Sequence, residues 1–181
     1  MDILNRYIIP YKEYKNGTHH FEFEISRDLF DAFDEDEIKK AEVLAEVEMN
    51  RHDTETTLEI RLSGNVTVEC DRCLDELVLP VSFESKAKLT FDADETDTEF
   101  DMICVAPEEE KACLGEYLYE SILLSLPSRK VHADTKDCNP EMLRRFNIVS
   151  QEEFDAIEAQ RHTIGENPEF EKLAELKKTL E

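Results

Sequence analysis

The sequence predicts an α+β protein, in which an antiparallel β-sheet meander carries one packed helix and a helical appendage follows at the C-terminus. Two observations support this fold class. Much of residues 20–105 alternates apolar and polar side chains with the period of two that half-buried strands show. The apolar segment 114–126 then has the length of a buried helix. With 181 residues, of which 40% are hydrophobic, the chain can bury one substantial core.

Alternating segments are expected to supply five to seven strands. They are 21–25, 43–49, 58–62, 66–70, 77–83, 87–91 and 100–104. Each has one apolar and one polar face, which favours an antiparallel sheet over a buried parallel one. Ser63-Gly64-Asn65 separates the third segment from the fourth and is expected to turn a hairpin. Pro80 cannot donate a ladder hydrogen bond, so its strand is expected to be an edge strand or bulged there.

Two helices are expected within this domain. Ser26 is placed to cap a short helix with apolar residues on one side. Those residues are Leu29, Phe30 and Phe33. The longer helix, at 114–126, ends before Pro127 and is expected to bury one apolar face. That face consists of Leu114, Leu118 and Ile122.

The C-terminal region contains two helix-start signals. Residues 150–153 form a capping box, and Asn167-Pro168 combines an N-cap residue with proline at the first helical position. We therefore expect an α+β domain over residues 1–147 and a helical appendage over 148–181.

Acidic residues dominate the charge, because 44 Asp and Glu against 21 Lys and Arg give a formal net charge of −23. Residues 91–120 are the most acidic part, with eleven acidic residues and a single lysine. Such a charge repels polyphosphate at long range. The segment is interpreted either as a solvated loop that keeps the protein soluble, or as a docking face for a basic protein partner.

No segment approaches the roughly 18 apolar residues of a membrane span, and the N-terminus lacks a basic leader followed by an apolar run. We therefore expect a cytoplasmic protein without a membrane partner. Five cysteines, an odd number at wide spacing, argue against a framework of structural disulfides. The sequence predicts no oligomeric state.

Cys70 and Cys73 form a Cys-x-x-Cys pair between two strand-like segments. Redox chemistry requires a stabilised thiolate, and the surrounding carboxylates disfavour that form. They are Glu69, Asp71, Asp75 and Glu76. A closed zinc site requires two further ligands. Cys138 and His132 are the candidates for these, ahead of Cys104 and Cys113. Our preferred interpretation is a pair of small thiols packed at a strand junction, with zinc as the alternative.

Enzymatic signatures are absent from the sequence. With four glycines, the chain has no glycine-rich phosphate loop, no G-x-S-x-G elbow and no H-E-x-x-H pair. Nothing in the sequence indicates a catalytic site, and we expect a protein that is not an enzyme.

Three stretches together resemble a known family. VTVECDRCLDELVLPV at 66–81 resembles the signature segment of the bacterial YceD-like family, the large ribosomal RNA subunit accumulation proteins. LGEYLYESILLSLPSRKVHADTKDC at 114–138 and ENPEFEKLAELKKTLE at 166–181 follow in the family's order. The matching positions outside the candidate zinc ligands are Arg72, Leu74, Leu126, Pro127, Asn167, Pro168, Leu173, Leu176 and Lys177.

This resemblance implies a non-enzymatic factor that supports 23S rRNA accumulation and assembly of the large ribosomal subunit. Some family members carry a second cysteine cluster near the C-terminus, of which only Cys138 is present here. RNA affinity depends largely on Lys and Arg, and clusters of either are few in this chain. We therefore expect a basic ribosomal or assembly protein as the partner, and an indirect action on the 23S rRNA precursor. The competing hypothesis is a small zinc-binding or dithiol redox protein unrelated to ribosomes.

Overall fold

A computed structural model describes residues 3–53, 55–92, 96–145 and 154–156. The chain divides into two compact units, residues 1–132 and 133–181. The expected boundary at 147/148, the capping box at 150–153 and the tail from Asn167 to Lys177 lie outside the described residues.

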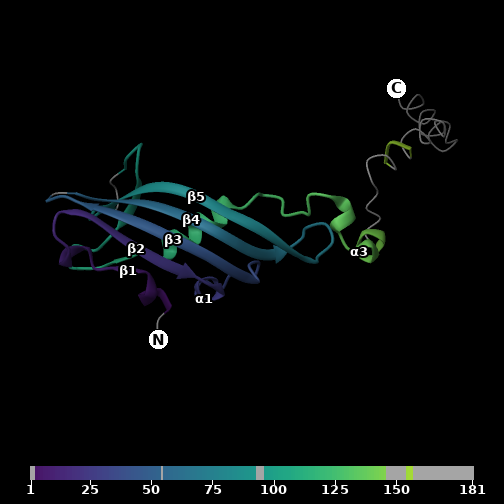
Figure 1. Ribbon diagram of the computed structural model, residues 1–181, viewed down its shortest axis with the longest axis horizontal. Helices are drawn as coiled ribbons and strands as arrows, with labels where there is room; N and C mark the ends of the chain where they lie inside the picture. The colour runs from purple at the N-terminus through teal and green to yellow at the C-terminus, as the bar shows by residue number, and fades with distance from the viewer. Residues whose placement is uncertain (1–2, 54, 93–95, 146–153, 157–181) are drawn as a thin grey trace, which may run out of the picture. The chain divides into compact units, whose positions relative to one another are not determined.

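The first unit is built on a five-stranded sheet with the strand order β2-β3-β4-β5-β6. The strands are β2 (Gly17–Ile25), β3 (Lys40–Arg51), β4 (Thr56–Glu69), β5 (Glu76–Thr90) and β6 (Asp101–Cys104). The four long strands run alongside one another (Figure 1), and each is antiparallel to the next. The predicted fold class, an antiparallel meander within an α+β protein, is therefore confirmed.

The last strand corrects one detail of the prediction, because β6 runs parallel to β5. Ala87 pairs with Asp101 and Thr90 with Cys104. Ten residues, 91–100, separate the end of β5 from the start of β6, and the first residue of β6 lies opposite Ala87 rather than opposite the last residue of β5. A tight hairpin would have forced the antiparallel arrangement. Alternation of side chains gives no information on strand direction.

The predicted hairpin turn at Ser63-Gly64-Asn65 is wrong, because these residues lie inside β4 and pair with both β3 and β5. The buried apolar side chains before and after Gly64 all have even numbers. They are Leu58, Ile60, Leu62, Val66 and Val68. The alternation therefore passes through Gly64 without a change of phase, as it does in a continuous strand.

Gly64 is in the strand because the neighbouring backbone approaches closely there. Its φ is +153°, and a Cβ at this position would overlap the carbonyl oxygen of Glu42 and lie 2.7 Å from the Cα of Val43. Glycine inside a strand often marks such an approach.

Gly64→Ala is expected to lower the free energy of unfolding by about 1 to 3 kcal/mol, since the new methyl group forces the two strands apart. Ser63→Ala, one residue earlier and exposed, is the control and is expected to change stability by less than about 0.5 kcal/mol. Urea unfolding of both variants measures the difference. Equal stability of the two variants would contradict this account of Gly64.

β5 likewise joins two expected strands, 77–83 and 87–91, into one. Pro80 lies opposite Asn65 of β4. On the other side of β5, the described part of the chain offers only β6 as a neighbour, and β6 pairs with residues 87–90 alone. Pro80 is thus at an edge of the sheet, as its missing N–H predicted.

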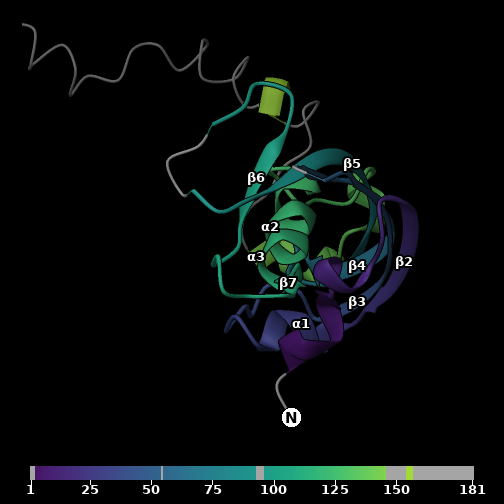
Figure 2. The same cartoon turned by 90° about the vertical axis from the view of Figure 1, so that its left-hand side faces the viewer.

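Helix α2 (Gly115–Ser125) packs against the sheet, which curves around it (Figure 2). Leu114, Leu118 and Ile122 are fully buried, as predicted. The Tyr117 hydroxyl donates to Asp101 Oδ2 (2.6 Å) and accepts from Ser85 Oγ (2.8 Å), which attaches the helix to β6 and β5. Burial and the hydrogen bond to Asp101 raise the pKa of Tyr117 to about 12.

Smaller elements complete the first unit. They are η1 (Ile3–Tyr7), β1 (Ile8–Ile9), η2 (Tyr11–Glu13), α1 (Arg27–Asp31) and β7 (Ala112–Cys113). The predicted helix after Ser26 is confirmed as α1, with Leu29 and Phe30 buried, but the Ser26 side chain makes no capping hydrogen bond and Phe33 lies beyond the end of the helix. β1 and β7 form a separate antiparallel pair of two residues each, too short for alternation to reveal.

The described part of the second unit contains η3 (Thr135–Asp137) and α3 (Pro140–Arg145). Asn139 caps α3, because its side-chain oxygen accepts from the backbone N–H of Glu141 at 3.0 Å. The sequence did not predict α3, although Asn139-Pro140 is the same helix-start signal as Asn167-Pro168.

Candidate metal centre

The Cys-x-x-Cys pair lies in the turn that connects β4 to β5. Cys70 follows the last residue of β4, and its N–H donates to the carbonyl of Asp75 at 2.9 Å. The N–H of Leu74 donates to the carbonyl of Cys70 at 2.8 Å and closes the turn around the two thiols. The strand pair therefore holds both cysteines, and both are fully buried.

Leu74 gives this turn its shape. Its φ of 63° lies in the left-handed region, which bulky side chains rarely adopt. Tight zinc turns often place glycine directly after the second cysteine, and Leu74 takes the glycine-like conformation at that position. Its side chain is 51% exposed, so it contributes little to the core.

A second segment, which follows α2, is attached to this turn by two hydrogen bonds between Asp71 and Lys130. The N–H of Asp71 donates to the carbonyl of Lys130 at 2.7 Å, and the N–H of Lys130 donates to Asp71 Oδ2 at 2.6 Å. The Lys130 ammonium also pairs with Glu37 at 2.6 Å. These contacts place His132, two residues later, beside the cysteines.

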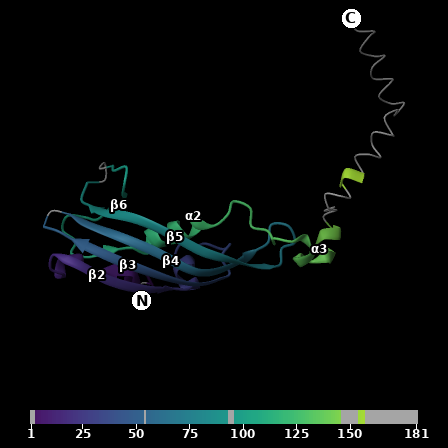
Figure 3. The ribbon, with the colours of Figure 1, turned by 45° about the horizontal axis from the view of Figure 1, so that its top comes forward.

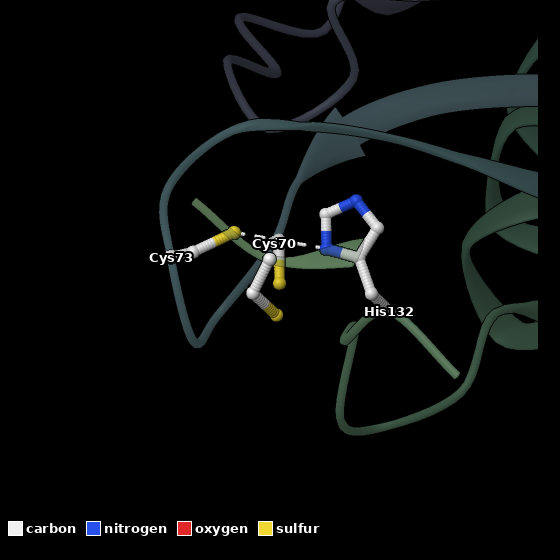
Figure 4. Close-up of side chains that lie close together, drawn as sticks. Cys70, Cys73 and His132 are labelled. Carbon is white, nitrogen blue, oxygen red and sulfur yellow. Dashed lines mark hydrogen bonds between the residues drawn. The ribbon is translucent and has the colours of Figure 1, made fainter. Parts of the chain in front are cut away.

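Figure 4 shows the Cys73 thiol directed at the imidazole of His132, with 3.6 Å between Sγ and Nδ1. The ligand atoms of four residues lie within 4.8 Å of one another. The four are Cys70, Cys73, His132 and Cys138. Zinc bound to sulfur at about 2.3 Å and nitrogen at about 2.0 Å in a tetrahedron separates its ligand atoms by about 3.5 to 3.8 Å. The four ligand atoms therefore lie close enough together to hold a metal ion, and shifts of up to about 1 Å would bring them to the spacing of zinc ligands.

The other two cysteines lie apart from this group. Cys104 and Cys113 are exposed, and the Cys113 thiol points to the carbonyl of Leu4 at 3.7 Å. Within the described residues, the four-residue group is the one set of cysteine, histidine and carboxylate side chains close enough to hold a metal ion.

The electrostatics of Cys70 differ from the sequence-based expectation that neighbouring carboxylates disfavour its thiolate. Burial raises the pKa of Cys70, but hydrogen bonds from the backbone N–H groups of Arg72, His132 and Cys73 outweigh it, and the pKa falls to about 6. Backbone donors stabilise a thiolate without adding a cation. The thiolate is also the form that binds metal.

Two positions of the family resemblance mark the end of α2. Leu126 is the C-cap, with its N–H donating to the carbonyl of Leu123 at 3.2 Å, and Pro127 follows. Proline here stops the helix and directs the chain toward the segment that carries His132.

None of the described helices is long and apolar enough to cross a membrane.

Comparison with known proteins identifies one family. The sequence model of the large ribosomal RNA subunit accumulation protein YceD matches residues 58–177. No curated protein and no solved structure matches the chain. The matched region begins in β4, includes the Cys-x-x-Cys turn, β5, α2 and His132, and covers well over half of the sequence. The chain therefore belongs to the YceD family of large ribosomal RNA subunit accumulation proteins.

Proposed function

We propose that this protein supports the accumulation of 23S rRNA during assembly of the large ribosomal subunit, as a non-enzymatic factor that binds a basic protein. The match of residues 58–177 to the YceD family carries this proposal. The family is described as an accumulation factor. A binding role agrees with a candidate centre whose side chains are suited to holding a structure together.

The proposal includes a structural zinc ion held by Cys70, Cys73, His132 and Cys138. Three thiols and one imidazole are a donor set typical of closed structural zinc sites, where four protein ligands leave no position for a substrate. The burial of the three cysteines and the lowered pKa of Cys70 support it. Bound zinc would supply a cross-link between the β4–β5 turn and the segment after α2.

The charge distribution supports a basic protein rather than RNA as the direct partner. At a net charge of −23, long-range repulsion opposes contact with phosphates. Described acidic residues of the 91–120 segment are exposed, including Asp97, Glu99 and Glu108. Exposed carboxylates attract a basic protein from a distance and raise its association rate.

Depletion of the protein tests this role directly. In cells that produce it, depletion is expected to lower the ratio of 23S to 16S rRNA, and expression of the native chain should restore the ratio. Immature large-subunit particles should accumulate in sucrose gradients. An unchanged ratio after complete depletion would contradict the proposed function.

A further inference from the structure

One border of the sheet is open for pairing. β2 is the outermost strand, with β3 on one side and no strand on the other among the described residues, and Figure 3 shows it at the border of the sheet. Its register with β3 is unbroken over nine residues, from Gly17 opposite Arg51 to Ile25 opposite Val43. An edge strand of this length presents a row of unpaired backbone groups.

The backbone groups that face this border can be identified. In an antiparallel ladder, alternate residues hydrogen-bond to opposite sides. The N–H of His52 donates to the carbonyl of Glu55 at 2.8 Å, so even-numbered residues of β3 bond to β4 and odd-numbered residues bond to β2. The even-numbered residues of β2 therefore direct their N–H and C=O groups outward. They are Thr18, His20, Glu22 and Glu24.

Other contacts agree with this assignment. The hydroxyl of Tyr7 reaches the carbonyl of Glu24 at 3.5 Å from outside the ladder. At the opposite border, the same alternation directs the nitrogen of Pro80 outward, where its missing N–H costs no hydrogen bond.

The two borders are protected to different degrees. β5 is covered by β6 at residues 87–90, and Pro80 removes an outward donor from the remainder. β2 has no proline, no lysine and no bulge. On its inner face Tyr14 packs on Phe21, with 5.3 Å between ring centroids, so the surface left for a partner is the backbone row and the outer face.

The outer face beside this row is acidic. Glu22 and Glu24 of β2 are exposed, and Glu46 of β3 lies directly opposite Glu22. Like charges in opposite positions destabilise a sheet. No cation pairs with these three carboxylates within the described residues. By contrast, the outer carboxylates of β4 and β5 are paired, Glu59 with Lys86 and Glu84 with Arg61.

We propose that the open edge of β2 binds an extended, lysine- or arginine-rich segment of a partner protein as a sixth strand. Backbone hydrogen bonds to Thr18, His20 and Glu22 would give affinity, since the carbonyl of Glu24 already accepts from Tyr7. Alternate basic side chains would lie over Glu22, Glu24 and Glu46. A second copy of β2 would add further glutamates to a face that is already acidic, which disfavours self-pairing relative to a basic segment. This inference rests on the proposed function, and it specifies which kind of segment of the basic partner binds.

Amide hydrogen exchange resolved by NMR tests the edge on the full-length protein. The probe is an acetylated and amidated octapeptide in which lysine alternates with threonine, and the control peptide has glutamate in place of lysine. The lysine peptide is expected to slow exchange at His20 and Glu22 by at least about tenfold, while the amides of Phe21 and Phe23, already bonded to β3, stay unchanged. The glutamate peptide should have no effect.

Two matched variants separate strand pairing from general charge attraction. Glu22→Pro removes one carboxylate and one outward N–H from β2, and Glu84→Pro makes the same change on β5. Glu22→Pro is expected to weaken lysine-peptide binding by about tenfold or more, and Glu84→Pro by less than about twofold. Glu22→Gln keeps the backbone N–H, so it should retain the alternating protection from amide exchange. It replaces Glu22→Pro as the test variant if the proline variant fails to fold.

Three results would overturn the inference. They are equal binding by the two proline variants, protection elsewhere than at the even-numbered residues of β2, and protection that rises with protein concentration without peptide, which would assign the edge to a second copy. A failure of the depletion experiment can be distinguished from these results, because the 23S to 16S ratio does not depend on where the peptide binds.

Discussion

Replacing Leu118 with alanine is expected to lower the free energy of unfolding by about 2 to 5 kcal/mol. Leu118 lies in the middle of α2 and has no exposed surface, and α2 lies against the concave face of the sheet. The substitution removes three buried carbon atoms and leaves a cavity that the surrounding side chains fill only in part. Urea or thermal unfolding measures the change.

Leu124→Ala is the matched control, because Leu124 lies on the same helix with 80% of its surface exposed. Both variants make the same chemical change and alter helix propensity equally. The control is expected to move stability by less than about 0.5 kcal/mol. If the two variants unfolded at the same denaturant concentration, the packing of α2 on the sheet would be wrong.

Cys70→Ser is expected to abolish stoichiometric zinc binding. Serine is isosteric with cysteine but does not supply a thiolate, and the remaining three ligands hold the ion far less tightly. The native protein, purified without chelator, should carry one zinc ion per chain by elemental analysis. Cys104→Ser is the control, since Cys104 is exposed and lies outside the four-residue group.

Zinc that binds only the folded protein also stabilises it by mass action, by about 2.7 kcal/mol when free zinc exceeds Kd by about a hundredfold. A chelator should therefore lower the thermal midpoint of the native protein and of Cys104→Ser, and leave Cys70→Ser unchanged. A native protein free of metal, or a Cys70→Ser variant that retains it, would instead favour two thiols packed at the strand junction.

The sequence was informative about the strands because their alternation is long and regular. It misplaced a turn in β4, since Ser63-Gly64-Asn65 has the composition of a turn while the phase of Leu62 and Val66 continues through it. Composition and phase disagreed, and phase was the better guide. The direction of β6 depends on the path of the link 91–100, which carries no periodic signal.

The residues of the candidate centre could be predicted from their spacing and order in the chain. Cys70 and Cys73 are a pair by spacing, and His132 and Cys138 follow α2 in the family's order. The hydrogen bonds between Asp71 and Lys130 could not be predicted, because they join residues 59 positions apart through backbone groups and one carboxylate, and impose no pattern on the sequence. The lowered pKa of Cys70 was missed for the same reason, since backbone N–H groups cause it.

Co-purification with large-subunit precursors, before and after nuclease treatment, tests the central proposal most directly. An affinity-tagged native chain is expected to retain basic ribosomal or assembly proteins after the RNA is digested, and to release them as salt rises from about 0.1 M to 1 M and the Debye length falls from about 10 Å to 3 Å. Loss of every protein partner on digestion, together with tight binding of the isolated chain to 23S rRNA fragments, would contradict it. That result would assign recognition to RNA itself, with the exposed Arg144 and Arg145 of α3 as the first basic residues to examine.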